Sequence, residues 1–182
     1  MKNLLLNLGC GSKSIPGFVH IDLADFPHIQ YKHDIKTLPM FKNNSVDLIY
    51  CCHALEYFDR KEAEEALKEW YRVLKNGGTL RLAVPDFKAI TDVYQKYGEL
   101  EHEGILGPLY GRIKLGDNLI YHKTVYDFTS LRRLLKSVGF KDVEKYDWHK
   151  TIHRNYDDFS QAYVPFKNEA GILVSLNVEA KK

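Results

Sequence analysis

The stretch Asn7-Leu8-Gly9-Cys10-Gly11 closes the first apolar run of the chain, Leu4 to Leu6, and constrains the fold more than any other segment. An apolar run followed by glycines at alternate positions predicts a buried strand and then a tight backbone turn. Glycine reaches positive φ at little cost and leaves room beside the main chain. Because nucleotides bind at the carboxyl ends of strands in parallel α/β sheets, the turn predicts a nucleotide-like ligand there.

Segments with strand-like and helix-like patterns alternate along the chain. Short apolar runs bounded by Gly, Pro, Asn or Asp predict buried strands at residues 4–8, 18–21, 46–51, 79–84, 143–148 and 172–178. One helix is predicted after Asp59, whose partner Glu62 completes a capping box, and it ends at Asn76-Gly77-Gly78. A second helix is predicted between Thr129 and Gly139. This alternation predicts an α/β fold with a doubly wound sheet.

Composition restricts the class of protein further. With 182 residues, of which 45% are hydrophobic, the chain fits one domain with a full core. The 26 Lys and Arg residues nearly balance the 24 Asp and Glu residues, so neither nucleic acid nor a membrane surface is the expected partner. The three cysteines cannot build a disulfide framework, and no leader or long apolar run is recognised, so a cytoplasmic location is predicted.

Seven segments resemble the successive motifs of one enzyme family. In chain order they are Asn7-Leu8-Gly9-Cys10-Gly11, His20-Ile21-Asp22-Leu23, Asp34-Ile35, Ser45-Val46-Asp47-Leu48-Ile49-Tyr50, His53-Ala54-Leu55-Glu56, Leu74-Lys75-Asn76-Gly77-Gly78 and Val84-Pro85-Asp86. Their order and spacing look like those of the class I S-adenosylmethionine-dependent methyltransferases, in the small single-domain, type 11-like form. The resemblance implies a Rossmann-like, mostly parallel seven-stranded sheet with an antiparallel last strand, for which 172–178 is the candidate.

The resemblance also implies which residues face the methionine part of S-adenosylmethionine. Asn7, Gly9, Cys10 and Gly11 would bring main-chain N–H and C=O groups against its amine, carboxylate and sulfonium. The alternative is a tight turn without a ligand.

Two further pairs are implied for the nucleoside part of the cofactor. Asp22, followed by Leu23, ends the second predicted strand, where a carboxylate accepts hydrogen bonds from both ribose hydroxyls. Asp34 and Ile35 resemble the pair that addresses adenine, the carboxylate accepting from the exocyclic amine while the apolar side chain packs on the ring. The alternatives are a surface turn for the first aspartate and a solvated loop for the second.

Cys51 ends the third predicted strand and His53 follows it, where the backbone of this family contacts the cofactor. His53 would close over the sulfonium side, or it is a histidine at a helix start that bonds to the main chain. Cys51 and Cys52 point to opposite sides of a strand and fit buried packing better than nucleophilic chemistry.

The glycine turn departs from the family pattern in two ways. Asn7 stands where an acidic residue is usual, so it can accept a hydrogen bond but brings no charge. Lys13 replaces the third glycine, and the first connection is short or irregular. Asp22 lies 13 residues after Gly9, whereas a dinucleotide fingerprint places its acid about 20 residues on. A nicotinamide-dependent oxidoreductase is therefore the lesser reading.

Residues outside the cofactor motifs must supply the chemistry. The segment 99–126, rich in glycine and tyrosine, is predicted to be an inserted acceptor-recognition element or lid within the single domain 1–182. His122 is the candidate general base, since imidazole titrates near neutral pH, although a histidine satisfied by the backbone is the equal alternative. Asp86 would orient that histidine or bind an acceptor hydroxyl, or it caps the following helix.

Other polar residues carry weaker signals. His149 and His153 have helical metal-binding spacing, but no Cys or acidic partner completes a pattern, and no metal is expected. The segment 157–160 precedes the last strand and belongs either to the acceptor pocket or to a solvated loop.

The sequence thus predicts an enzyme that transfers methyl from S-adenosylmethionine to an oxygen or nitrogen atom of a small molecule, with a sugar or nucleotide-sugar as one class that fits. The alternatives are an NAD(P)-dependent oxidoreductase and a non-catalytic S-adenosylmethionine-binding sensor or scaffold. The identity of the acceptor and the oligomeric state are left open.

Overall fold

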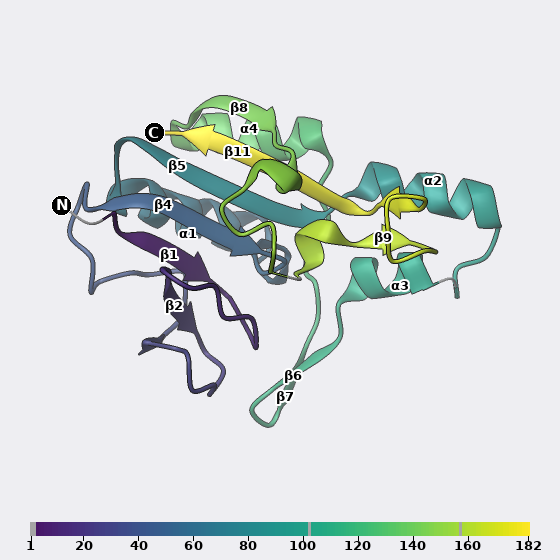
Figure 1. Ribbon diagram of the computed structural model, residues 1–182, viewed down its shortest axis with the longest axis horizontal. Coiled ribbons are helices and arrows are strands. Elements are labelled where there is room, and N and C mark those ends of the chain that lie inside the picture. The colour runs from purple at the N-terminus through teal and green to yellow at the C-terminus, as the bar shows by residue number, and fades with distance from the viewer. Residues whose placement is uncertain (1–2, 102, 157) are drawn as a thin grey trace.

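A computed structural model describes residues 3–101, 103–156 and 158–182 (Figure 1). The described residues form a seven-stranded sheet of order β3-β2-β1-β4-β5-β11-β8. Its strands are β1 (Leu5–Leu8), β2 (Val19–Asp22), β3 (Tyr31–Lys32), β4 (Val46–Cys52), β5 (Leu74–Pro85), β8 (Lys141–Lys145) and β11 (Ser175–Lys181). β11 runs antiparallel to both neighbours, and the other pairs are parallel. The mostly parallel sheet with an antiparallel last strand is confirmed.

The remaining described elements are helices and two small ribbons. The helices are α1 (Arg60–Val73), α2 (Phe87–Tyr97), α3 (Glu103–Tyr110) and α4 (Phe128–Val138), with 3-10 turns η1 (Leu55–Tyr57), η2 (Trp148–Lys150) and η3 (Phe159–Gln161). The ribbons pair β6 (Ile113–Leu115) with β7 (Asn118–Ile120) and β9 (Tyr163–Val164) with β10 (Ile172–Leu173). The predicted last strand at 172–178 is therefore divided, because residues 172–173 pair with β9 before β11 joins the sheet.

Capping explains where two helices begin. The Asp59 side chain accepts from the N–H groups of Lys61 and Glu62, and Glu62 accepts in return from the Asp59 N–H, so the predicted capping box is confirmed. α4 begins two residues earlier than predicted, because Asp127, rather than Thr129, accepts the Ser130 N–H at 2.7 Å.

The two faces of the sheet are covered differently. On one face, alternate residues of β4 such as Ile49 and Cys51 join the main core with Trp70 of α1 and Leu131 of α4. On the other face, Tyr50 packs with residues of the irregular connection between β1 and β2, and His153 and Asp158 lie against it. In the described part of the chain, β1, β2 and β3 are joined to the next strand without an intervening helix.

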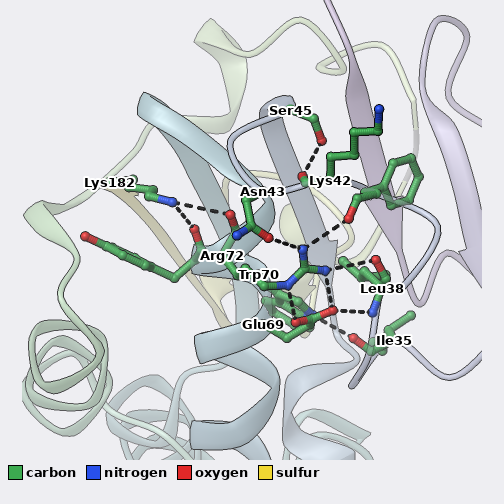
Figure 2. A network of polar contacts seen from close by, with 11 residues as sticks. Ile35, Leu38, Lys42, Asn43, Ser45, Glu69, Trp70, Arg72 and Lys182 are labelled. Carbon is green, nitrogen blue, oxygen red and sulfur yellow. Dashed lines mark hydrogen bonds and ion pairs between the residues drawn. The ribbon is translucent and has the colours of Figure 1, made fainter.

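A polar network ties the loop after β3 to α1 (Figure 2). Arg72 pairs with Glu69 at 2.7 Å and donates to the Leu38 carbonyl, while Glu69 accepts the Leu38 N–H. The indole N–H of buried Trp70 donates to the Ile35 carbonyl at 2.7 Å. These bonds fix the position of the loop that carries Ile35 and Leu38.

The chain has no described helix that combines the length and the apolar character needed to cross a bilayer.

Candidate functional site

The glycine turn after β1 lies against the loop after β4. Gly9 has a φ of +64° and donates its N–H to the Ile21 carbonyl of β2. A Cβ on Gly9 would lie 2.4 Å from the Cβ of Ala54 and 3.3 Å from Cδ1 of Ile35, so packing as well as backbone conformation requires glycine. A Cβ on Gly11, whose φ is +52°, would meet nothing within 4 Å. The turn is therefore closed on the Gly9 side and open at Gly11.

Asp22 joins the first two strand ends. Its Oδ2 accepts the Gly11 N–H at 2.7 Å, and its Oδ1 accepts the Ala24 N–H at the same distance. Leu23 beside it is 47% exposed. A carboxylate and an exposed apolar side chain thus border the open side of the turn.

The other two residues of the turn are buried. Asn7 lies within β1 and is 2% exposed. Cys10 is also buried, with its Sγ 3.9 Å from Nε2 of His28, which donates to the Gly11 carbonyl. Burial raises the pKa of the Cys10 thiol to about 12, so this thiol is no nucleophile at neutral pH.

Asp34 and Ile35 lie at the far side of the same turn. The Asp34 carboxylate accepts the Lys36 N–H at 2.9 Å and forms an ion pair with the Lys36 ammonium at 3.7 Å. Ile35 is buried in the main core and borders Gly9. The structure therefore brings Gly9, Asp22 and Asp34 to one end of the sheet.

His53 enters the site from the end of β4. Its φ is +51°, its N–H donates to the Ala83 carbonyl of β5, and its Nε2 lies 3.1 Å from the Ser175 hydroxyl. Its Nδ1 lies 3.4 Å from Oε1 of Glu56. Burial, and secondarily the neighbouring His122, lowers the pKa of His53 to about 3, so the ring is neutral.

Glu56 is the functional candidate that sequence reasoning missed. It lies in η1, is 0% exposed, and neither carboxyl oxygen has a hydrogen-bond partner among the described residues. Burial raises its pKa to about 8. The spacing of His53 and Glu56, three residues apart across a strand end, was the available signal.

His122 reaches the same carboxyl from the loop before α4. Its Nδ1 donates to the Pro108 carbonyl at 2.9 Å, and its Nε2 lies 3.7 Å from Oε1 of Glu56. Burial lowers its pKa. A Cβ on Gly111 would lie 1.9 Å from Nε2 of His122, so the ring occupies space that only a glycine leaves. The backbone thus satisfies one ring nitrogen and leaves the other facing Glu56.

Asp86 lies at the end of β5 and caps α2. Its Oδ1 accepts the Lys88 N–H at 3.1 Å, and its own N–H donates to the Val174 carbonyl. The contacts of the described residues include no hydrogen bond between Asp86 and His122. The capping alternative therefore accounts for the carboxylate.

The remaining candidates lie elsewhere. His149 is on the surface with Asp147 and Glu169, whereas His153 is buried, and no described group of three or more His, Cys, Asp or Glu side chains is arranged for a metal ion. Cys51 and Cys52 pack into opposite faces of the sheet.

In the segment 157–160, Asp157 lies outside the described residues. Asp158 is buried and accepts hydrogen bonds from the Tyr50 hydroxyl and from Ser160, so a solvated loop does not describe it.

A mostly parallel sheet with one antiparallel strand before the edge, and with a glycine turn and an acid at the first two strand ends, defines the class I methyltransferase fold. Residues 18–82 match a family model described as a methyltransferase domain. A solved S-adenosylmethionine-dependent methyltransferase from Methanosarcina mazei superimposes with a TM-score of 0.61 at 17% identity, over 100% of this chain and 93% of that one.

Two curated proteins are similar in sequence. An uncharacterized methyltransferase of Schizosaccharomyces pombe is 30% identical over 145 residues, covering 73% of this chain and 57% of that protein. A glycine/sarcosine N-methyltransferase of Aphanothece halophytica is 30% identical over 116 residues, covering 56% and 44%. The chain therefore spans about half the length of these relatives. The chain has the fold of the class I S-adenosylmethionine-dependent methyltransferases, and its residues 18–82 match a methyltransferase-domain family.

Proposed function

We propose that the protein transfers a methyl group from S-adenosylmethionine to a nitrogen or oxygen atom of a small molecule. The observation that carries this proposal is the meeting of the open Gly11 turn and the Asp22 carboxylate at 2.7 Å, at the strand ends where this fold binds nucleosides. The methyltransferase domain model over residues 18–82 supports it.

The cofactor, when bound, supplies an electrophilic methyl group on a sulfonium. The residues fit such a group, because Gly11 leaves open space beside the main chain and the Asp22 carboxylate lies next to it. In this proposal Asn7, Gly9, Cys10 and Gly11 border the methionine part. Asp22 exchanges its bond from Gly11 for the ribose hydroxyls, with Leu23 beside them.

In the same proposal, Asp34 and Ile35 contact the adenine ring. The loop that carries them is held to α1 by Trp70 and Arg72 (Figure 2), so little ordering remains to be done when the ring binds. Cys51 and His53 lie at the end of β4, toward the sulfonium.

The acceptor side is proposed to be formed by residues 99–126 within a single domain 1–182. This segment contains α3 and the β6–β7 ribbon, which projects from the body of the molecule (Figure 1), and it carries His122. His122 is the proposed base, and Asp86 a secondary candidate that first serves as a cap. The name of the Aphanothece relative favours a small amine over a sugar hydroxyl as the acceptor.

Calorimetry and methyl transfer test the proposal separately. The full chain should bind S-adenosylmethionine and S-adenosylhomocysteine but not NAD. Radiolabelled methyl should then pass to a pool of small amines or to a pool of sugars and nucleotide-sugars. Binding of NAD alone would indicate an oxidoreductase, whereas cofactor binding with no transfer to any pool would favour a sensor or scaffold.

A further inference from the structure

Three segments distant in sequence bring titratable groups together around Glu56. His53 comes from the end of β4, Glu56 from η1, and His122 from the loop before α4. Backbone bonds hold the two loops together, since the N–H groups of Lys123 and Thr124 both donate to the Glu56 carbonyl. The cluster is therefore a built feature of the packing.

The hydrogen-bond partners of His122 fix which of its nitrogens carries the proton. A carbonyl oxygen only accepts, so Nδ1, at 2.9 Å from the Pro108 carbonyl, must be the protonated nitrogen. The neutral ring then presents the lone pair of Nε2 to Glu56.

The partners of His53 give the complementary tautomer. The Ser175 hydroxyl donates to Oδ1 of Asn177, whose amide N–H donates in turn to the Ser160 carbonyl. The Ser175 oxygen is therefore left as an acceptor for Nε2–H of His53, at 3.1 Å. The backbone of Phe159 is a further hydrogen-bond partner of His53. With Nε2 as the donor toward Ser175, the neutral ring presents the lone pair of Nδ1 to Glu56.

Two lone pairs therefore face one carboxyl oxygen, Oε1 of Glu56, at 3.4 and 3.7 Å. An ionised carboxylate in that position would oppose both of them, whereas a protonated one can donate to either. We infer that Glu56 is a positioning residue that keeps a proton at neutral pH and donates it to the neutral ring of His53 or of His122, whose opposite tautomers the Ser175 and Pro108 oxygens fix. The consequence for catalysis, a neutral His122 whose Nε2 is free to accept a proton while Glu56 donates to His53, rests on the proposed function, but the shared proton does not.

The surroundings of Glu56 support a neutral carboxylic acid. Among the described residues, the basic nitrogens within ion-pair distance of Glu56 are those of His53 and His122. Cys51 and Cys52 of β4, Tyr57 of η1 and Tyr126 also face it, and none of them brings a positive charge. Arg60 stacks on the ring of Tyr126, 4.5 Å from its centroid, and forms no described ion pair with Glu56. Burial raises the pKa of Glu56 to about 8, in agreement with the hydrogen-bond pattern.

Nitrogen-15 NMR of the histidine rings tests the inference on the full chain at pH 7. We expect neutral His122 protonated on Nδ1 and neutral His53 protonated on Nε2. Glu56→Gln, which can still donate from its amide, should keep both tautomers. An imidazolium at either ring would place the proton on histidine and overturn the inference, as would one equivalent of bound metal found by elemental analysis.

The pH dependence of unfolding is an independent measurement. Between pH 6.5 and 8 the native chain should hold a proton on Glu56 that the unfolded chain releases, so the unfolding equilibrium constant should rise by up to about tenfold per pH unit. Glu56→Gln should remove this rise, and Glu64→Gln, at an exposed carboxylate paired with Lys68, should retain it. An equal rise in Glu56→Gln would overturn the inference. Neither measurement uses the cofactor, so failure of methyl transfer would leave both results readable.

Discussion

The main-chain N–H of Gly11 donates a hydrogen bond to Oδ2 of Asp22 at 2.7 Å, so the turn after β1 and the acidic end of β2 hold each other in place. This bond joins two residues that are 11 positions apart in the sequence, so the turn and the strand end form one continuous surface. A ligand with two adjacent hydroxyls would compete for the same carboxylate, which couples cofactor binding to the shape of the glycine turn.

Replacing Asp22 should weaken the cofactor more than it weakens the fold. Asp22→Ala removes a charged acceptor worth about 1.5–3 kcal/mol, so the Kd for S-adenosylhomocysteine should rise by about 10- to 100-fold. Calorimetry measures this. Asp25→Ala, at an exposed carboxylate three residues on, is the matched control and should change the free energy of binding by less than about 0.5 kcal/mol. Equal Kd values for the two variants would remove the ribose assignment.

Gly9 should be intolerant of any side chain. Gly9→Ala combines a positive φ, which costs about 1–2 kcal/mol, with a Cβ placed 2.4 Å from that of Ala54, and overpacking adds about 1–3 kcal/mol. The free energy of unfolding, measured with urea, should fall by the sum of these two costs. Gly17 has a φ of +86°, but a Cβ there would meet nothing within 4 Å. Gly17→Ala should therefore lower the free energy of unfolding only by the conformational cost. Similar losses in both would mean that the contact with Ala54 relaxes freely.

His122 should matter for turnover and not for cofactor binding. His122→Asn can keep an amide donor toward the Pro108 carbonyl while it lacks the second ring nitrogen, so folding should be largely retained. If this histidine is the base, kcat should fall by about 100-fold or more, with the Kd for S-adenosylmethionine unchanged. His149→Asn, on the surface, should leave both constants as they are. Unchanged turnover in His122→Asn would exclude the base assignment.

Local signals explain why most of the fold could be predicted. The Asp59 capping box, the glycine turn and the bounded apolar runs each act within a few residues, so they can be read without knowing what they pack against. The start of α4 shows the limit of such signals, since Asp127 and Thr129 are both good caps and only the bond to Ser130 decides.

The polar cluster could not be predicted in the same way. Glu56 and His122 meet only because the loop before α4 pairs with the backbone of η1, and no local pattern records that pairing. Likewise, Asp158 reaches Tyr50, 108 residues away in the sequence, only when the segment 158–161 packs against β4. Long-range packing of buried polar groups is decided by the assembled core.

Buried neutral histidines should make the protein sensitive to acid. The folded pKa values of His53 and His153, about 3 and about 4, lie below the ordinary value of 6.5. As the pH falls, the unfolded chain therefore binds protons before the folded chain does. Each ring then lowers the free energy of unfolding as the pH decreases from 6.5 to its folded pKa. Glu56, with a folded pKa of about 8, acts in the opposite direction between pH 8 and 4.5. Two histidines against one carboxyl group therefore leave a net proton uptake on unfolding that grows from near zero at pH 6.5 toward about one as the pH falls to 4.5.

His153 offers the more direct test of this acid limb, because it is none of the proposed site residues and its ring centroid lies 4.0 Å from that of Tyr50. His153→Phe keeps an aromatic ring on Tyr50 and removes one titrating group. The unfolding equilibrium constant can be measured by urea titration at several pH values from 6.5 to 4.5. For each unit by which the pH falls, its increase in His153→Phe should be smaller than in the unmodified chain by a factor of up to about ten. An acid limb of unchanged slope would mean that His153 is already protonated in the native state, paired with the Asp158 carboxylate 4.0 Å away.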